Sequence, residues 1–124
     1  MSRFAGRRIL IVEDEVIIGM MATDMLEEMG ATVLGPAMNV DQGVAMAESE
    51  QADAALVDIN LGGTRSDAVV DVLTRRGVPV IFTTGYGRAD GDRRMVLEKP
   101  YTAASLAKAL EEALAVGGRA GIGA

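Results

Sequence analysis

Short apolar runs alternate along this chain with longer segments whose apolar residues recur at helical spacing. The runs are rich in β-branched residues and have the length of strands that are covered on both faces. They predict five strands, at residues 8–12, 32–35, 54–58, 79–84 and 95–98. The segments between and after them predict helices that begin near 16, near 39 or 41, near 66 or 67, and near 102.

This alternation of strands and helices predicts the α/β class. Right-handed crossovers join such elements into a doubly wound parallel sheet with helices on both faces. One connection departs from the pattern, because the segment 85–94 is too short and too rich in glycine for a full helix. A reduced or disordered helix is expected there. The last helix is expected to end near 116, which gives a single domain over 1–116 and a flexible tail over 117–124.

Four methionines lie within the first predicted helix. Methionine fills irregular gaps in hydrophobic cores, so we expect these side chains to pack in the core and along the helix face. The alternative is a docking surface, since soft side chains would suit the helix bundle of a partner. The four residues are Met20, Met21, Met25 and Met29.

Composition narrows the chemistry that this domain can perform. The 124 residues contain no cysteine and no histidine, which excludes disulfides, thiolate or imidazole metal ligands, and Ser-His or Cys-His nucleophilic pairs. A net charge of −6 without a basic stripe argues against a nucleic-acid partner. No apolar stretch approaches the roughly 20 residues needed to span a bilayer, and no signal peptide is recognised. We therefore expect a cytoplasmic protein with no membrane partner.

The carboxyl ends of the predicted strands carry acidic side chains, and the functional site of a doubly wound sheet lies at these ends. Glu13 and Asp14 follow the first strand, and Asp58 ends the third. Carboxylates gathered at one edge repel one another, and a hard divalent cation such as Mg²⁺ relieves that repulsion. We predict that Asp14 and Asp58 bind Mg²⁺, that Glu13 binds it directly or through water, and that Asn60 contributes its backbone carbonyl.

A carboxylate beside Mg²⁺ can act as a nucleophile toward a phosphoryl group and form an aspartyl phosphate. Asp58 is the best candidate because it ends the central strand, with the acids on one side and further polar groups on the other. Thr84 offers a hydroxyl and Lys99 an ammonium, which together neutralise charge on the phosphoryl oxygens. Thr83 is the alternative source of the hydroxyl.

Taken together, these positions resemble the CheY-like response-regulator receiver domain of bacterial two-component signalling. The resemblance covers about residues 7–116 and implies a flavodoxin-like sheet of five parallel strands in the order 2-1-3-4-5. It also implies phosphorylation at Asp58, Mg²⁺ as the required ion, and a sensor histidine kinase or histidine phosphotransfer protein as the donor. The Lys99–Pro100 bond is expected to be cis. The matching elements are Ile9-Leu10-Ile11-Val12-Glu13-Asp14-Glu15, Val57-Asp58-Ile59-Asn60-Leu61, Thr84 and Lys99-Pro100.

Two departures from the usual receiver pattern indicate a subgroup. Only 14 residues separate Thr84 from Lys99, and Val96 stands where the family usually has an aromatic residue. The run 79–87 is similar instead to the FATGUY receivers, which carry a Phe-Ala-Thr-Gly-Tyr-type motif. In that subgroup the fourth helix is reduced or mobile and a tyrosine follows the switch threonine. This resemblance implies switching roles for Thr84 and Tyr86.

The predicted function is a stand-alone phosphoryl-accepting regulator, not an enzyme, that signals by contact with an unknown downstream protein. A phosphate sink or shuttle for a kinase is one alternative, and a degenerate receiver that is never phosphorylated is another. A haloacid-dehalogenase-like phosphatase uses similar groups, but it expects two aspartates two residues apart after its first strand. Here the candidate nucleophile Asp58 follows the third strand, and the residue two positions later is Asn60.

Overall fold

The computed structural model describes residues 3–85 and 95–123. Within them, five strands form one sheet in the order β2-β1-β3-β6-β7, and every neighbouring pair is parallel. This confirms the predicted doubly wound α/β fold and its strand order. The strands of the sheet are β1 (Arg8–Val12), β2 (Thr32–Ala37), β3 (Ala54–Asp58), β6 (Val80–Thr84) and β7 (Val96–Glu98).

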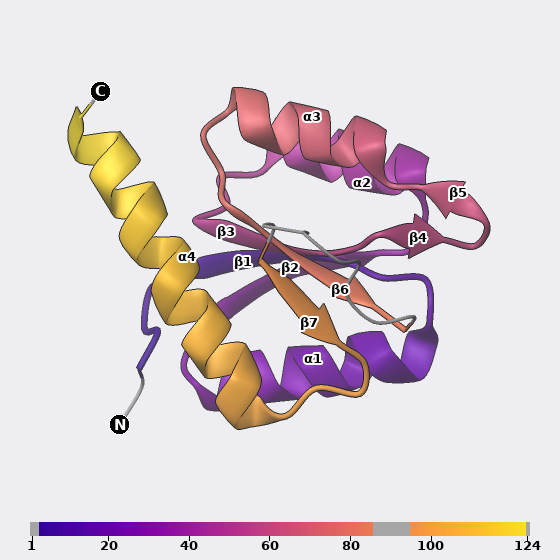
Figure 1. Ribbon diagram of the computed structural model, residues 1–124, viewed down its shortest axis with the longest axis horizontal. Coiled ribbons are helices and arrows are strands. Elements are labelled where there is room, and N and C mark those ends of the chain that lie inside the picture. The colour runs from indigo at the N-terminus through magenta and orange to yellow at the C-terminus, as the bar shows by residue number, and fades with distance from the viewer. Residues whose placement is uncertain (1–2, 86–94, 124) are drawn as a thin grey trace.

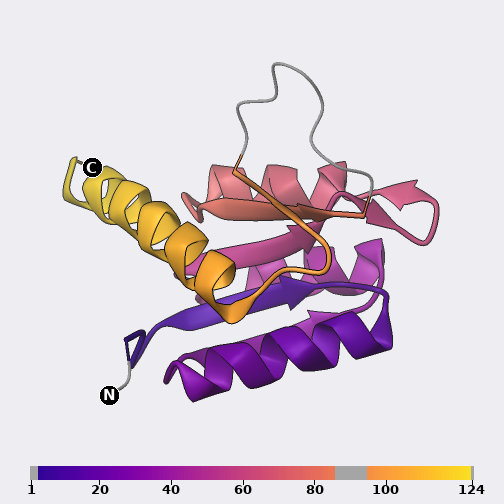
Figure 2. The same cartoon turned by 60° about the horizontal axis from the view of Figure 1, so that its bottom comes forward.

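Helices cover both faces of this sheet (Figure 1). On one face lie α1 (Val16–Glu28) and α4 (Ala103–Gly123), and on the other lie α2 (Val40–Ser49) and α3 (Asp67–Arg75). The turned view in Figure 2 shows α1 running beneath the sheet, with α4 crossing at one side. Within the described part of the chain, no helix is both long and apolar enough to cross a membrane. The expected reduced helix and Tyr86 fall in 86–94, outside the described residues.

The core consists of two layers, one on each face of the sheet. Along β1, Ile9 and Ile11 point into the layer shared with α1 and α4, whereas Leu10 and Val12 point into the layer shared with α2 and α3. All four side chains are at most 1% exposed. Because successive side chains of a strand point to opposite faces, a strand covered on both sides must be apolar throughout. This is why the apolar runs predicted the strands correctly.

Side-chain caps decide where two of the helices begin. Asn39 accepts a hydrogen bond from the backbone N–H of Gln42 at 2.9 Å, so Asn39 rather than Asp41 caps α2. Thr102 accepts one from the backbone N–H of Ser105 at 3.1 Å, immediately before α4. The structure therefore confirms the predicted start of the last helix and resolves the alternative that the sequence left at α2.

The structure extends two elements beyond their predicted ends and adds one hairpin. Strand β2 continues through Pro36 to Ala37, since an edge strand tolerates a residue without an N–H. Helix α4 continues past 116 to Gly123, because glycine lowers helix propensity without breaking the hydrogen-bond ladder as proline does. The division into a domain over 1–116 and a flexible tail over 117–124 stays a prediction. An unexpected hairpin follows β3, formed by β4 (Asn60–Leu61) and β5 (Thr64–Arg65).

The buried and exposed apolar residues of α1 are not all the ones that the sequence predicted. The helix buries Gly19, Ala22 and Leu26, while Met25 and Met29 pack at the margin of the core. Small residues bring the helix close to the sheet, which leaves the larger side chains of its first turns outside. The expectation of core packing is therefore wrong for Met20 and Met21, and Val16 and Ile17 are exposed with them, at fractions between 43 and 71%.

Candidate functional site

Three charged side chains are buried together at the carboxyl edge of the sheet. Asp58 is the last residue of β3, Glu13 directly follows the neighbouring strand β1, and Lys99 directly follows β7. Their side chains are only 7%, 4% and 9% exposed. Buried charges persist in proteins only when they are paired or hydrogen-bonded, so we expect these three side chains to pair with one another.

The Lys99 ammonium is the centre of this group. Its Nζ lies 2.7 Å from Asp58 Oδ2, 2.8 Å from Glu13 Oε1 and 3.0 Å from Glu15 Oε2. An ammonium has three donors, so these three carboxylate oxygens account for all of them. Among the described residues, one positive charge therefore faces three negative ones, and this negative excess suits the edge to a further cation.

Glu13, Asp14 and Asp58 form the cluster that fits such a cation. Each offers a carboxylate oxygen, and these oxygens all lie within 4.8 Å of one another. Oxygen ligands and a negative excess suit a hard divalent ion, which also accepts water in its remaining positions. The structure thus brings together the three acids that the sequence proposed as metal ligands, with Asp14 the most exposed of them.

The pKa values record how strongly the groups are coupled. The pKa of Glu13 is raised from 4.5 to about 7, because burial and the nearby Asp58 charge outweigh the hydrogen bonds from Lys99 and from the Glu15 N–H, which lower it. Burial lowers the pKa of Lys99, but hydrogen bonds to Asp58, Glu13 and Glu15 outweigh it, so that this pKa is raised above the ordinary value. The lysine is therefore a permanent cation at physiological pH.

The hairpin after β3 holds the other side of Asp58. The Asn60 N–H donates to Asp58 Oδ1 at 3.1 Å, and the Asn60 side chain accepts from the Gly63 N–H at 2.9 Å. A Cβ placed at Gly62 would lie 3.5 Å from Asp14 Oδ2, so the turn of the hairpin lies directly beside the acid cluster. Asn60 therefore orients the Asp58 side chain through its backbone N–H. The sequence alone did not predict this hydrogen bond.

Both threonines at the end of β6 are buried beside the site. Thr84, 6% exposed, accepts a hydrogen bond from the Lys99 N–H at its carbonyl, at 2.8 Å. Thr83, 1% exposed, pairs in register with Asp58. Thr83 and Thr84, the two alternative hydroxyl donors predicted from the sequence, therefore lie at successive positions beside the site.

Two residues of the site were missed at the sequence level. Glu15 directly follows the predicted metal ligands Glu13 and Asp14, but only the fold shows that its carboxylate accepts a hydrogen bond from Lys99. Tyr101 follows the Lys99–Pro100 bond, which is cis as expected. Burial and the nearby Glu13 charge raise the pKa of Tyr101 to about 12. Its place two positions after Lys99 is the sequence feature from which Tyr101 could have been predicted as a site residue.

Comparison with known proteins matches residues 9–111 to the response regulator receiver domain. The phyllosphere-induced regulator PhyR of Methylorubrum extorquens is 36% identical over 114 residues, which cover 86% of this chain and 43% of that protein. The solution structure of SdrG from Sphingomonas melonis Fr1 is 39% identical, with a TM-score of 0.77 over 92% of this chain and 99% of that one. The chain spans about half the length of curated relatives such as PhyR.

A third relative is the receiver domain of a sensor histidine kinase from Pseudomonas aeruginosa PAO1, solved with a magnesium ion coordinated in its active site cleft. It is 28% identical, with a TM-score of 0.76 over 90% of this chain and 99% of that one. The matches do not separate subgroups, so the FATGUY resemblance stays a prediction. The family match spans the whole acidic edge, from Glu13 to Lys99, together with the sheet that assembles it. The chain belongs to the response regulator receiver domain family.

Proposed function

We propose that this chain is a phosphoryl-accepting regulator of a two-component phosphorelay, with Asp58 as the phosphoacceptor. The observation that carries the proposal is the buried Asp58 carboxylate, held 2.7 Å from the Lys99 ammonium and beside two further acids. A structural ion pair needs one acid for one lysine, whereas the described residues of this edge gather several acids around Lys99. Such an excess is costly for folding and useful for binding a metal and a phosphoryl group.

In the proposed reaction, a carboxylate oxygen of Asp58 attacks the phosphorus of a phosphohistidine. An O–P bond forms as the P–N bond breaks, and the imidazole leaves with a proton taken from solvent. Lys99 offsets negative charge on one phosphoryl oxygen, and we assign the Thr84 hydroxyl to another because it ends the neighbouring strand. The switch then consists of these side chains changing partners around the new group.

Glu13, Asp14 and Asp58 are the side chains that would hold a divalent cation, with the backbone carbonyl of Asn60 as a further ligand. When bound, Mg²⁺ supplies neutralisation of phosphoryl charge and orientation of the incoming group. The magnesium coordinated in the active site cleft of the related kinase receiver domain supports Mg²⁺ as the ion here. The family is one of signalling proteins, so we expect no turnover of a separate substrate.

The donor phosphohistidine lies outside these 124 residues, which contain no histidine. We propose a sensor histidine kinase or a histidine phosphotransfer protein as the donor. The start of α1 beside the site exposes Val16, Ile17 and Met20 at 59 to 71%, and a groove of about 300 Å³ continues this apolar surface to Pro36 and Met38. An apolar surface of this kind suits a helical partner. The downstream target is a further protein that this chain contacts.

The test is a titration with Mg²⁺ and then with beryllofluoride, a stand-in for the phosphoryl group, followed by backbone amide NMR. Asp58→Asn removes the proposed acceptor while keeping its size. Asp71→Asn, on the exposed surface of α3, makes the same chemical change away from the site.

We expect Mg²⁺ to shift the amides around the acid cluster, and beryllofluoride to shift those at the end of β6. The beryllofluoride response should vanish in Asp58→Asn and persist in Asp71→Asn. If the wild-type protein binds neither probe, the chain is a degenerate receiver and the proposal is wrong.

A further inference from the structure

The Thr83 hydroxyl is a buried polar group that the ground-state structure does not use. The residue is 1% exposed, and among the described residues its Oγ1 has no hydrogen-bond partner. A buried hydroxyl without a partner destabilises the fold, and an apolar residue of the same shape would not carry that cost. Such a group therefore indicates a state of the molecule in which the hydroxyl does have a partner.

The strand register places this hydroxyl next to Asp58. Thr83 pairs with Asp58 of β3 on one side and with Leu97 of β7 on the other. Ile81 and Leu56 point into the core layer shared with α1 and α4, and side chains two positions along a strand share a face. Thr83 and Asp58 therefore stand side by side on that face, on strands about 4.8 Å apart.

The Lys99 side chain passes over β6 at the position of Thr83. Lys99 begins beyond the end of β7, yet its ammonium lies 2.7 Å from Asp58 Oδ2 at the end of β3. In the sheet, β6 lies between these two strands. Thr83 is the β6 residue in register with Asp58, so the lysine reaches its partner across Thr83.

We propose that Thr83 is a positioning residue for the phosphorylated state. When phosphorylation draws the Lys99 ammonium toward the phosphoryl oxygens, Asp58 Oδ2 loses its present donor. The Thr83 hydroxyl then donates to that oxygen and holds the Asp58 side chain in place. This inference rests on the proposed function, and it gives the two threonines of β6 different tasks: Thr84 serves the phosphoryl group, and Thr83 serves the carboxyl group that carries it.

The test compares the wild-type protein with Thr83→Val and Thr83→Ser. Valine keeps the shape of threonine and removes the hydroxyl, whereas serine keeps the hydroxyl and removes a methyl group. Each protein is titrated with Mg²⁺ alone and then with beryllofluoride at saturating Mg²⁺, and the affinities are taken from amide NMR shifts. Thermal unfolding without either ligand gives the stability of the ground state.

We expect Thr83→Val to raise the melting temperature by about 3 to 6 °C, because the unpartnered hydroxyl is gone. The same variant should bind beryllofluoride about 3- to 10-fold more weakly, the loss of one hydrogen bond, with its Mg²⁺ affinity unchanged. Thr83→Ser should retain the beryllofluoride affinity within about twofold and have a lower melting temperature, since a buried methyl is lost. A purely structural role would move affinity and stability in the same direction.

The outcomes separate this inference from the proposed function. If the wild-type protein responds to beryllofluoride and Thr83→Val responds with equal affinity, the role of Thr83 is wrong and the proposed function stands. A serine variant as weak as the valine variant also overturns the role, since the hydroxyl would then not be the cause. A wild-type protein that does not respond overturns both.

Discussion

Glu13 should make the apo protein less stable as the pH rises. Its pKa is raised from 4.5 to about 7, so between these values the native state binds more protons than the unfolded state. The free energy of unfolding therefore falls as the pH increases through this window. A pKa difference of this size corresponds to a change of about 3 kcal/mol in the free energy of unfolding, and the Glu13 side chain is only 4% exposed. Glu13→Gln removes this titration and keeps the shape of the side chain.

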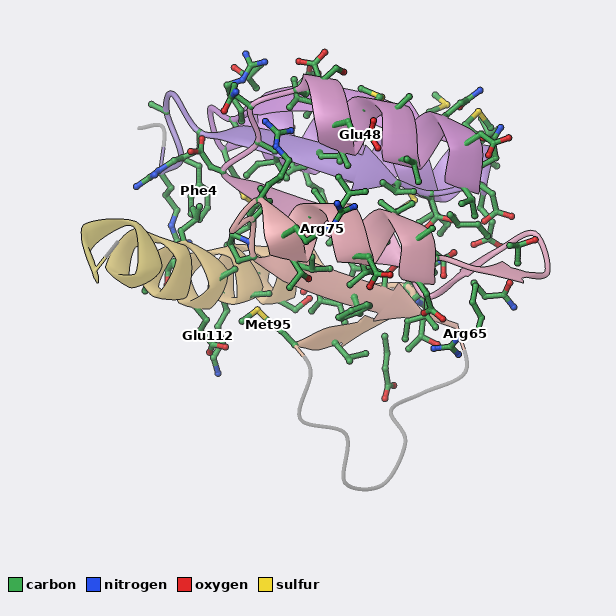
Figure 3. All side chains as sticks on the ribbon, turned by 90° about the horizontal axis from the view of Figure 1, so that it is seen from above. Phe4, Glu48, Arg65, Arg75, Met95 and Glu112 are labelled. Atoms are coloured by element: carbon green, nitrogen blue, oxygen red, sulfur yellow. The ribbon has the colours of Figure 1, made fainter. Side chains whose placement is uncertain are left out.

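The assay is urea unfolding of both proteins at a series of pH values between 4 and 8, with divalent cations removed by a chelator. The difference between the two free energies of unfolding isolates Glu13, because all other titrations occur in both proteins. We expect that difference to move by about 3 kcal/mol in favour of the glutamine variant. Glu48→Gln provides the control, on the exposed surface of α2 (Figure 3). Parallel wild-type and Glu13→Gln curves would refute the reasoning.

Two further substitutions test the charge balance of the site and the packing of α2 against α3. Lys99→Met leaves Asp58 and Glu13 without their cation, so the free energy of unfolding at pH 8 should fall by about 3 kcal/mol. The fall should be smaller at pH 5, where Glu13 is protonated, and an equal fall in urea unfolding at both pH values would contradict this. Gly43→Ala places a Cβ 2.8 Å from Val69 Cγ2, which should cost about 1 to 3 kcal/mol in thermal unfolding. A Cβ at Gly85 has no described atom within 4 Å, so Gly85→Ala is the control, and equal effects of the two substitutions would argue against the steric cause.

Much of the fold could be predicted from the sequence because the central strands are buried on both faces. Leu10 and Ile11 point to opposite layers and both must be apolar, so the run itself is the signal. The topology then follows from right-handed crossovers, and it brings Glu13, Asp58 and Lys99 to one edge. The α1 helix gave a weaker signal, since apolar residues occur on its exposed surface as well as on its buried one.

The finer arrangement of the site depends on contacts that no local pattern encodes. Glu15 and Lys99 are 84 positions apart, and nothing near either residue indicates that they pair. The hairpin over β4 and β5 has only two residues in each strand, too few to show an alternating pattern. Thr83 looks like an ordinary β-branched strand residue until the structure shows that its hydroxyl has no hydrogen-bond partner in the described part of the chain. Each of these facts requires the whole fold.

The proposed phosphorylation has a definite order of exchange at Lys99, because its three partners differ in exposure. Glu15 is 59% exposed, so solvent screens its ion pair and little is lost when that contact breaks. The contact with Asp58 weakens next, since the carboxylate charge moves onto the phosphoryl group. Glu13 remains buried and hydrogen-bonded to the ammonium, which makes it the fixed contact about which the lysine side chain turns. A site with one cation and several acids of unequal burial can therefore switch by exchanging partners, while the sheet that holds them stays fixed.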